Sequence, residues 1–72
     1  MDPLLTLEYA IAAFESGDIE GCSDLLYDYS KWRAKGGFEP DGVEFRGEKL
    51  KGDAANLELI RHLSKRAQQC TR

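Results

Sequence analysis

The sequence predicts a mainly all-α protein with an antiparallel helical hairpin, a short β-hairpin or ordered loop, and an amphipathic C-terminal helix. Three observations lead to this prediction. Apolar residues recur at spacings of three and four in both the first and the last part of the chain, which is the period of an α-helix. Capping residues, Asp-Pro once and Gly-Asp twice, stand where helices would begin or end. Between the two helical parts, residues 38–52 instead carry turn residues and a short alternation of apolar and polar positions.

Length and composition limit the possible architecture. With 72 residues, the chain is expected to form a single small helical domain over residues 1–72. Apolar residues make up 42% and charged residues 32%, a balance typical of a folded chain. A core of this size supplies only about 3–5 kcal/mol, so we expect further stabilisation by association.

The first helix is predicted to start at Asp2-Pro3, because Asp2 suits the capping position and Pro3 suits the first helical position. A second apolar stripe, Leu5, Tyr9 and Ala12, lies roughly opposite the main apolar face. This stripe is either ordinary exposed surface or a second contact face. The main face consists of Leu4, Leu7, Ile11 and Phe14.

The second helix is predicted to follow Asp18 and to end at Gly36-Gly37. The connection around Gly17-Asp18 is very short, which favours an antiparallel pair of helices. Trp32 closes the apolar face and is expected to be buried, whereas Tyr27 points away from that face. The predicted face consists of Ile19, Cys22, Leu25, Leu26, Tyr29 and Trp32.

The segment 38–52 is predicted to turn at Pro40-Asp41-Gly42, since Pro fixes φ and Gly accepts a positive φ. Val43-Glu44-Phe45 then alternates as a strand would. Phe38 and Phe45 are expected to anchor this small hairpin near Trp32. Alternatively, the hairpin is itself a binding loop.

The last helix is predicted to be capped by Asp53 and to be amphipathic. Its charged outer face is either a solvated surface or a docking surface for an acidic partner, including the acidic half of a second copy. The apolar stripe is assigned to Leu57, Ile60, Leu63 and Ala67, with Leu59 and Cys70 at its margin. The polar face is assigned to Glu58, Arg61, His62, Lys65 and Arg66.

The charges are divided unevenly along the chain. Residues 1–30 carry seven acidic and no basic residues, whereas residues 31–72 carry six acidic and all ten basic residues. The net charges of the two parts are therefore −7 and +4. This division disfavours an ordinary nucleic-acid binder, which needs a net basic surface, and favours docking of the acidic part against a basic surface.

The sequence lacks the patterns that catalysis or cofactor binding would require. It contains no phosphate-binding glycine loop, no zinc-type cysteine spacing, and His62 as its single histidine. We therefore expect no enzyme activity, no cofactor and no metal. The acidic N-terminus and the absence of a long apolar run predict a cytoplasmic protein without membrane insertion.

The run Trp32-Arg33-x-x-Gly36-Gly37-Phe38-x-Pro40, followed by Gly52-Asp53 and a last helix, resembles small accessory proteins encoded by bacteriophages and prophages. The resemblance implies a protein that binds and inhibits a host protein, such as a transcription regulator or a defence complex. It implies no particular site residues.

Together these observations predict a small regulatory or inhibitory protein that binds another protein stoichiometrically. The expected surface combines aromatic anchors with a charged rim, as compact interfaces do. Its residues are Leu5, Tyr9 and Tyr27, with Asp24 and Asp28. The alternative function is a nucleic-acid-associated regulator that uses the basic face of Arg61, Lys65 and Arg66.

The predicted working form is a homodimer in which the acidic helices of one chain meet the basic last helix of the other. The small core and the second apolar stripe of the first helix, with Leu5 and Tyr9, both favour this association. The competing possibility is a monomer in which the last helix folds over its own helical hairpin and neutralises it internally.

Overall fold

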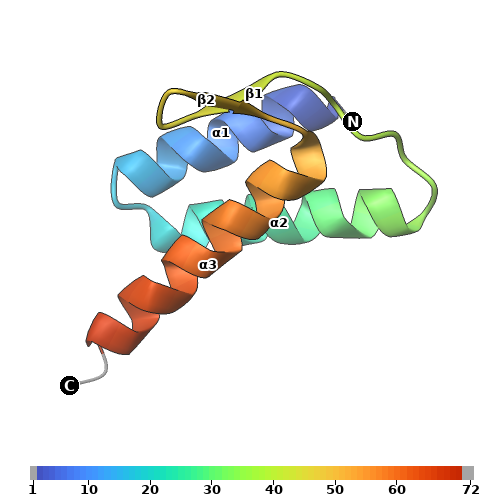
Figure 1. Cartoon of the computed structure of the whole chain (residues 1–72). Coiled ribbons are helices and arrows are strands. Elements are labelled where there is room, and N and C mark those ends of the chain that lie inside the picture. The colour runs from blue at the N-terminus through green and yellow to red at the C-terminus, as the bar shows by residue number, and fades with distance from the viewer. Residues whose placement is uncertain (1, 71–72) are drawn as a thin grey trace.

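The computed structural model describes residues 2–70, and side chains are described for residues 2–66. Over residues 2–70 the chain forms three helices and one two-stranded antiparallel sheet (Figure 1). In order, these are α1 (Pro3–Glu15), α2 (Ile19–Ala34), β1 (Val43–Phe45), β2 (Glu48–Leu50) and α3 (Gly52–Cys70). Figure 1 shows α1 and α2 side by side, with α3 crossing α2 diagonally. The predicted mainly α-helical fold is confirmed.

The helices α1 and α2 begin at the predicted capping residues. The Asp2 carboxylate accepts a hydrogen bond from the Leu5 N–H at 3.2 Å, and the Asp18 carboxylate accepts one from the Gly21 N–H at 2.9 Å. These bonds satisfy N–H groups that have no partner inside the helix. The faces that meet in the core contribute the buried residues Leu7, Ala10, Ile11, Phe14, Cys22, Leu26 and Tyr29.

Trp32 differs from the prediction, because it is only partly buried. Its ring makes an edge-to-face contact with Phe38, with the ring centroids 5.1 Å apart, and Phe38 itself is 65% exposed. A Cβ atom on Gly37 would overlap the Trp32 ring. Trp32 therefore covers the loop that follows α2, and it does not fill the centre of the core.

The β-hairpin is present, but the turn between its strands lies at Arg46-Gly47. Gly42 has the predicted positive φ, 74°, but it lies before β1. The sheet pairs Val43 with Leu50 and Phe45 with Glu48. Both turn residues have a positive φ, 53° at Arg46 and 83° at Gly47, which matches the right-handed twist of a two-residue hairpin. Phe45 is an anchor as expected, although it packs on Phe14 and His62 and not near Trp32.

The helix α3 is rotated relative to the predicted apolar stripe. Among the described side chains of α3, the buried apolar residues are Ala55 and Leu59, whereas Leu57 is 59% and Ile60 is 41% exposed. Leu63 is half-buried, and the side chains of residues 67 and 70 lie outside the described part of the chain. The small residues at 52 and 55 lie toward the core because α3 starts in close contact with the end of α2. The predicted stripe was therefore wrong at Leu57 and Ile60, whereas Leu63 packs against the core and Leu59, which was placed at the margin, is fully buried.

Candidate protein-interaction surfaces

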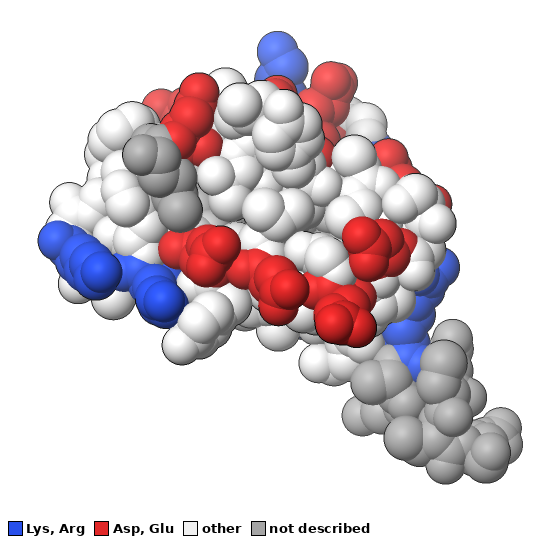
Figure 2. Space-filling model, turned by 180° about the vertical axis from the view of Figure 1, so that it is seen from behind, with Lys and Arg blue, Asp and Glu red and all other residues white. Residues whose placement is uncertain are grey.

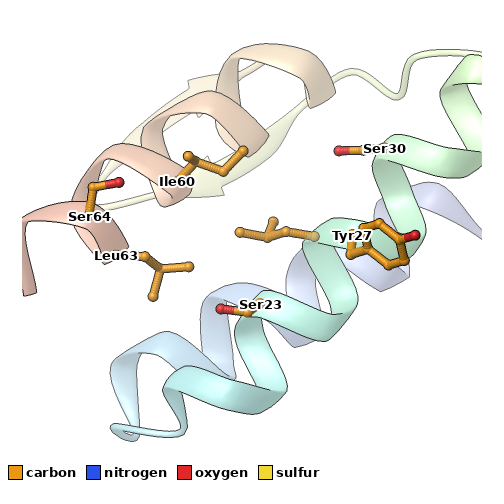
Figure 3. Close-up of a pocket in the computed structure, with 7 residues that line it drawn as sticks. Ser23, Tyr27, Ser30, Ile60, Leu63 and Ser64 are labelled. Atoms are coloured by element: carbon orange, nitrogen blue, oxygen red, sulfur yellow. The ribbon is translucent and has the colours of Figure 1, made fainter. Parts of the chain in front are cut away.

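An open groove lies between α2 and α3 (Figure 3). Its volume is about 360 Å³. Figure 3 shows Ile60 and Leu63 of α3 facing the side of α2 that carries Ser23 and Tyr27. The groove is therefore apolar at its centre and carries hydroxyl groups at its margins, which is typical of a surface that accepts side chains of a partner. Its lining residues are Ser23, Leu26, Tyr27, Ser30, Ile60, Leu63 and Ser64.

Small side chains keep this groove open. Serine stands at positions 23 and 30 of α2 and at 64 of α3, so neither helix fills the space between them. Near Ser30, the Asn56 amide Nδ2 donates to the Ser30 hydroxyl at 3.3 Å and links the two helices. This hydrogen bond therefore joins the two helices at the end of the groove where Ser30 lies.

A polar cluster fixes the start of α3 against the end of α2. The Asp53 carboxylate accepts hydrogen bonds from the Tyr29 hydroxyl at 2.8 Å, the Arg33 Nε at 2.8 Å and the Arg33 Nη2 at 2.6 Å. The Arg33 Nη1 also donates to the Gly37 carbonyl oxygen at 2.6 Å. The two parallel bonds between Arg33 and Asp53 set distance and orientation together. This cluster determines the angle at which α3 crosses α2, and so the shape of the groove.

Asp53 lies within the first turn of α3 and is not its capping residue. Its backbone N–H instead donates a hydrogen bond to a Glu39 carboxylate oxygen at 2.9 Å. The Gly52 N–H donates one to the Pro40 carbonyl oxygen at 2.8 Å. The preceding loop therefore caps α3. The predicted capping role of Asp53 was wrong because its carboxylate is engaged by α2.

The cluster also changes the acidity of its members. Hydrogen bonding from Arg33 lowers the pKa of the Asp53 carboxyl below its ordinary value of 3.8. Burial raises the pKa of the Tyr29 hydroxyl, and the bond to Asp53 raises it further. Both shifts favour the protonation states that make these hydrogen bonds.

Gly52 permits the close approach of the segments that meet at this point. A Cβ atom at this position would lie 2.5 Å from both the Tyr29 hydroxyl oxygen and the Pro40 Cδ atom. No real Cβ contact is that short, so a larger residue would push α3 away from α2. Glycine is needed here for packing, not for an unusual φ.

An acidic row runs along the exposed side of α2 next to the groove. Glu20, Asp24 and Asp28 are all exposed and stand four residues apart, so they lie along one side of the helix. Figure 2 shows a row of acidic side chains across the face seen from behind, with basic side chains at one end of it. Tyr27 is 64% exposed between this row and the groove, and the Lys31 ammonium lies 4.9 Å from the centre of its ring.

The outer face of α1 forms a separate apolar surface. Leu5 is 41% and Tyr9 is 58% exposed, on the side of the helix opposite the buried Leu7 and Ile11. Neither Leu5 nor Tyr9 lines the groove to which Tyr27 belongs. The structure therefore places the predicted partner-binding residues on two surfaces, with Tyr27 beside the acidic row and Leu5 with Tyr9 on α1.

The structure does not present Arg61, Lys65 and Arg66 as one basic stripe. Arg61 forms an ion pair with Glu58 at 3.3 Å, and the Arg66 guanidinium lies 5.1 Å from the centre of the Phe14 ring. All three residues are exposed, but Arg66 lies against the end of α1 that carries Phe14, whereas Arg61 and Lys65 lie on the outer side of α3. The charge available for a nucleic-acid backbone is correspondingly smaller than the sequence suggests.

An aromatic cluster that was not predicted covers the core at the end of α1 that carries Phe14. The half-buried His62 ring lies 5.8 Å from Phe14 and 5.5 Å from Phe45, edge-on to both. Its Nδ1 lies 2.8 Å from the Glu58 carbonyl oxygen, and the Arg46 guanidinium covers the Phe45 ring at 5.5 Å. His62 was assigned to the polar face, and the structure makes it a packing residue.

No family model, curated protein or solved structure matches the chain. None of the helices described over residues 2–70 is both long and apolar enough to cross a membrane. Within the same residues, no three His, Cys, Asp or Glu side chains are grouped so that they could hold a metal ion.

Burial raises the pKa of the Cys22 thiol, so this cysteine is held in its neutral form.

Proposed function

We propose that this protein is a small regulatory or inhibitory protein of the cytoplasm that acts by stoichiometric binding to another protein. The observation that carries the proposal is the presence of two separate apolar surfaces on a very small chain. One is the outer face of α1 with Leu5 and Tyr9, and the other is the α2–α3 groove with Tyr27 and Ile60. Exposed apolar surface of this kind, bordered by charged residues, typically marks contact sites for other proteins.

The proposed target site is the outer face of α1. Tyr9 supplies a large aromatic side chain, of the type that carries most of the energy in compact interfaces. The acidic residues Glu8 and Glu15 accompany it on α1, and the helix has no basic residue. The target is therefore proposed to present an apolar pocket bordered by basic residues. The resemblance of the Trp32–Pro40 run to phage accessory proteins supports a bacterial host protein as this target.

Affinity capture with the full chain as bait tests the proposed target site. We expect wild-type protein to retain one host protein in equimolar amount, and Tyr9→Glu to lose it. Phe38→Glu is the matched control, since it replaces another exposed aromatic residue, which lies in the loop between α2 and β1. Equal retention by Tyr9→Glu and wild type would reject the α1 site. Absence of any equimolar protein would reject the proposed function.

We also propose that the working form is a homodimer. Within the described residues, the ion pairs are Arg33 with Asp53 and Arg61 with Glu58, and neither joins an acid of α1 or α2 to a base of α3. The charge difference between the two parts of the chain is therefore not neutralised by ion pairs inside the described fold. A second copy provides the complementary charges.

A further inference from the structure

We infer that the α2–α3 groove is the contact between two copies of this chain, related by a two-fold axis that runs parallel to the groove. The inference rests on the proposed homodimer and names the surface and orientation by which it forms. The groove is an unfilled apolar surface within the fold, with a volume of about 360 Å³. A second copy brings to it the same apolar side chains, so each contact is made twice.

The apolar part of this contact lies along the centre. Ile60 lines the groove and is 41% exposed, and Leu57, one turn earlier on α3, is 59% exposed. Tyr27 stands on the opposite wall and is 64% exposed. Burying Tyr27 of each copy against Leu57 and Ile60 of the other would remove these side chains from water on both copies, which supplies the driving force for association.

Opposite charges border the two sides of the groove. The acidic row Glu20, Asp24 and Asp28 lies beyond Tyr27 on α2, and no basic residue occurs on α2 before Lys31. Beyond Ile60 and Leu57 on α3, helical spacing places Arg61 and then Lys65. Arg61 is ion-paired with Glu58 at 3.3 Å across an exposed contact, so this pair would have to be shared or exchanged when Arg61 meets an acid of a second copy. From α2 to α3, the surface therefore presents the acidic row, then the apolar groove, then a basic edge.

This order selects the orientation of the two-fold axis. An axis parallel to the groove sets α2 of one copy opposite α3 of the other, so that acids face bases on both sides. An axis perpendicular to the groove would set α2 against α2, and acids would face acids. Since like charges placed opposite each other are unfavourable, the parallel axis is the compatible one.

Residues of α2 and α3 can also be compared by their level along the length of the groove. Asn56 lies level with Ser30, where the two side chains are hydrogen-bonded, and α3 then runs toward the start of α2. Ile60 therefore lies near the middle of the groove. Ser64 lies at its far end, at the level of Ser23. An axis parallel to the groove preserves these levels, which brings Asp24 of one copy near Arg61 of the other.

Light scattering after size exclusion tests the inferred contact. Wild-type protein at tens of micromolar is expected to have twice the chain mass of 8.1 kDa. Ile60→Glu is expected to raise the dimer dissociation constant by about 30-fold or more, because it introduces a charge at the centre of the contact twice. Tyr27→Glu, at a more exposed position, serves as a second variant. Leu5→Glu is the matched control on α1 and is expected to remain dimeric.

The possible outcomes separate this inference from the proposals on which it rests. A dimer that dissociates with Leu5→Glu but not with Ile60→Glu or Tyr27→Glu would keep the homodimer and reject the groove contact. A monomeric wild type would reject the homodimer and the groove contact together. In either case the proposed target site stands or falls separately, by capture with Tyr9→Glu.

Exchange of charges tests the orientation. Asp24→Arg and Arg61→Asp are each expected to raise the dissociation constant by about tenfold, because each places like charges opposite each other. The variant that carries both changes is expected to recover the wild-type value, as is an equimolar mixture of the two single variants. Failure of both to recover would reject the parallel axis. Thermal melting by circular dichroism identifies any variant that fails to fold.

Discussion

Asp53 links the start of α3 to the end of α2 and to the loop that follows α2. Its carboxylate accepts hydrogen bonds from Tyr29 and Arg33 of α2, while its N–H is held by Glu39 of the intervening loop. A carboxylate used in this way acts as a fixed point for the start of α3. The direction of α3, and with it the wall of the groove that α3 supplies, therefore depends on this residue.

The lowered pKa of Asp53 predicts a particular dependence of stability on pH. The folded protein releases this proton more readily than the unfolded chain, so the contribution is present above the ordinary pKa of 3.8 and is lost as pH falls through the lower folded pKa. We expect the unfolding free energy of wild type to fall in this acid range. Asp53→Asn should unfold at lower denaturant concentration near neutral pH and lose that part of the acid dependence.

Urea unfolding followed by Trp32 fluorescence, from about pH 2 to pH 7, checks this prediction. Asp41→Asn is the control, because Asp41 is an exposed carboxylate in the loop before β1. If Asp41→Asn and Asp53→Asn change the curves equally, Asp53 has no special contribution.

Gly52 makes a second prediction at the scale of single residues. Alanine usually favours a helix over glycine by about 1 kcal/mol, yet here the added Cβ would lie 2.5 Å from the Tyr29 hydroxyl oxygen and the Pro40 Cδ. We therefore expect Gly52→Ala to destabilise the fold by about 1–3 kcal/mol, as overpacking does. Combining it with Tyr29→Phe removes one of the two close contacts, so the two changes should cost less together than the sum of their separate costs. Additive costs in thermal melts would show that the contact is not limiting.

At the scale of elements, the hairpin offers a direct comparison between two phenylalanines. Phe45 is 4% exposed and packs on Phe14, whereas Phe38 is 65% exposed. We expect Phe45→Ala to reduce the unfolding free energy by about 3–4 kcal/mol. We expect Phe38→Ala to change it by about 0.5 kcal/mol. Chemical denaturation of both variants measures the difference, and similar values for the two would refute the assigned anchoring role of Phe45.

The helices were largely predictable, and the reasons are local. Asp2, Asp18 and the apolar positions of α1 and α2 follow rules that depend on neighbours a few residues away. The hairpin turn was misplaced because Pro40-Asp41-Gly42 has stronger turn chemistry than Arg46-Gly47. Arg46 gives no sign in the sequence that it will adopt a positive φ.

The register of α3 and the groove depend on contacts that local sequence does not determine. Leu57 and Ile60 look like core residues by spacing alone, but the Arg33–Asp53 pair and the space at Gly52 orient Ala55 and Leu59 inward. Tyr27 was a candidate binding residue from the sequence, whereas the opposite wall with Ile60 and Leu63 was not. The serines at 23 and 30, seven residues apart on one side of α2, were the available signal of an unfilled surface.

At the scale of the whole molecule, the acidic and basic parts of the surface lie on the two sides of the same apolar groove. The acidic row and the basic edge border the same groove, while Leu5 and Tyr9 lie on α1 outside it. This arrangement lets two copies associate through their grooves and still present α1 of each copy to a target. The protein is thus proposed to bind its target with two equivalent sites, which increases avidity for a target that is itself dimeric.

Isotope-filtered NOE measurements on a mixture of labelled and unlabelled chains test the central claim most directly, because they detect only contacts between copies. The account predicts intermolecular NOEs between the Tyr27 ring and the Ile60 and Leu57 methyl groups, and none to Leu5 or Tyr9. Intermolecular NOEs confined to Leu5 and Tyr9, or their complete absence at concentrations of tens of micromolar and above, would contradict it.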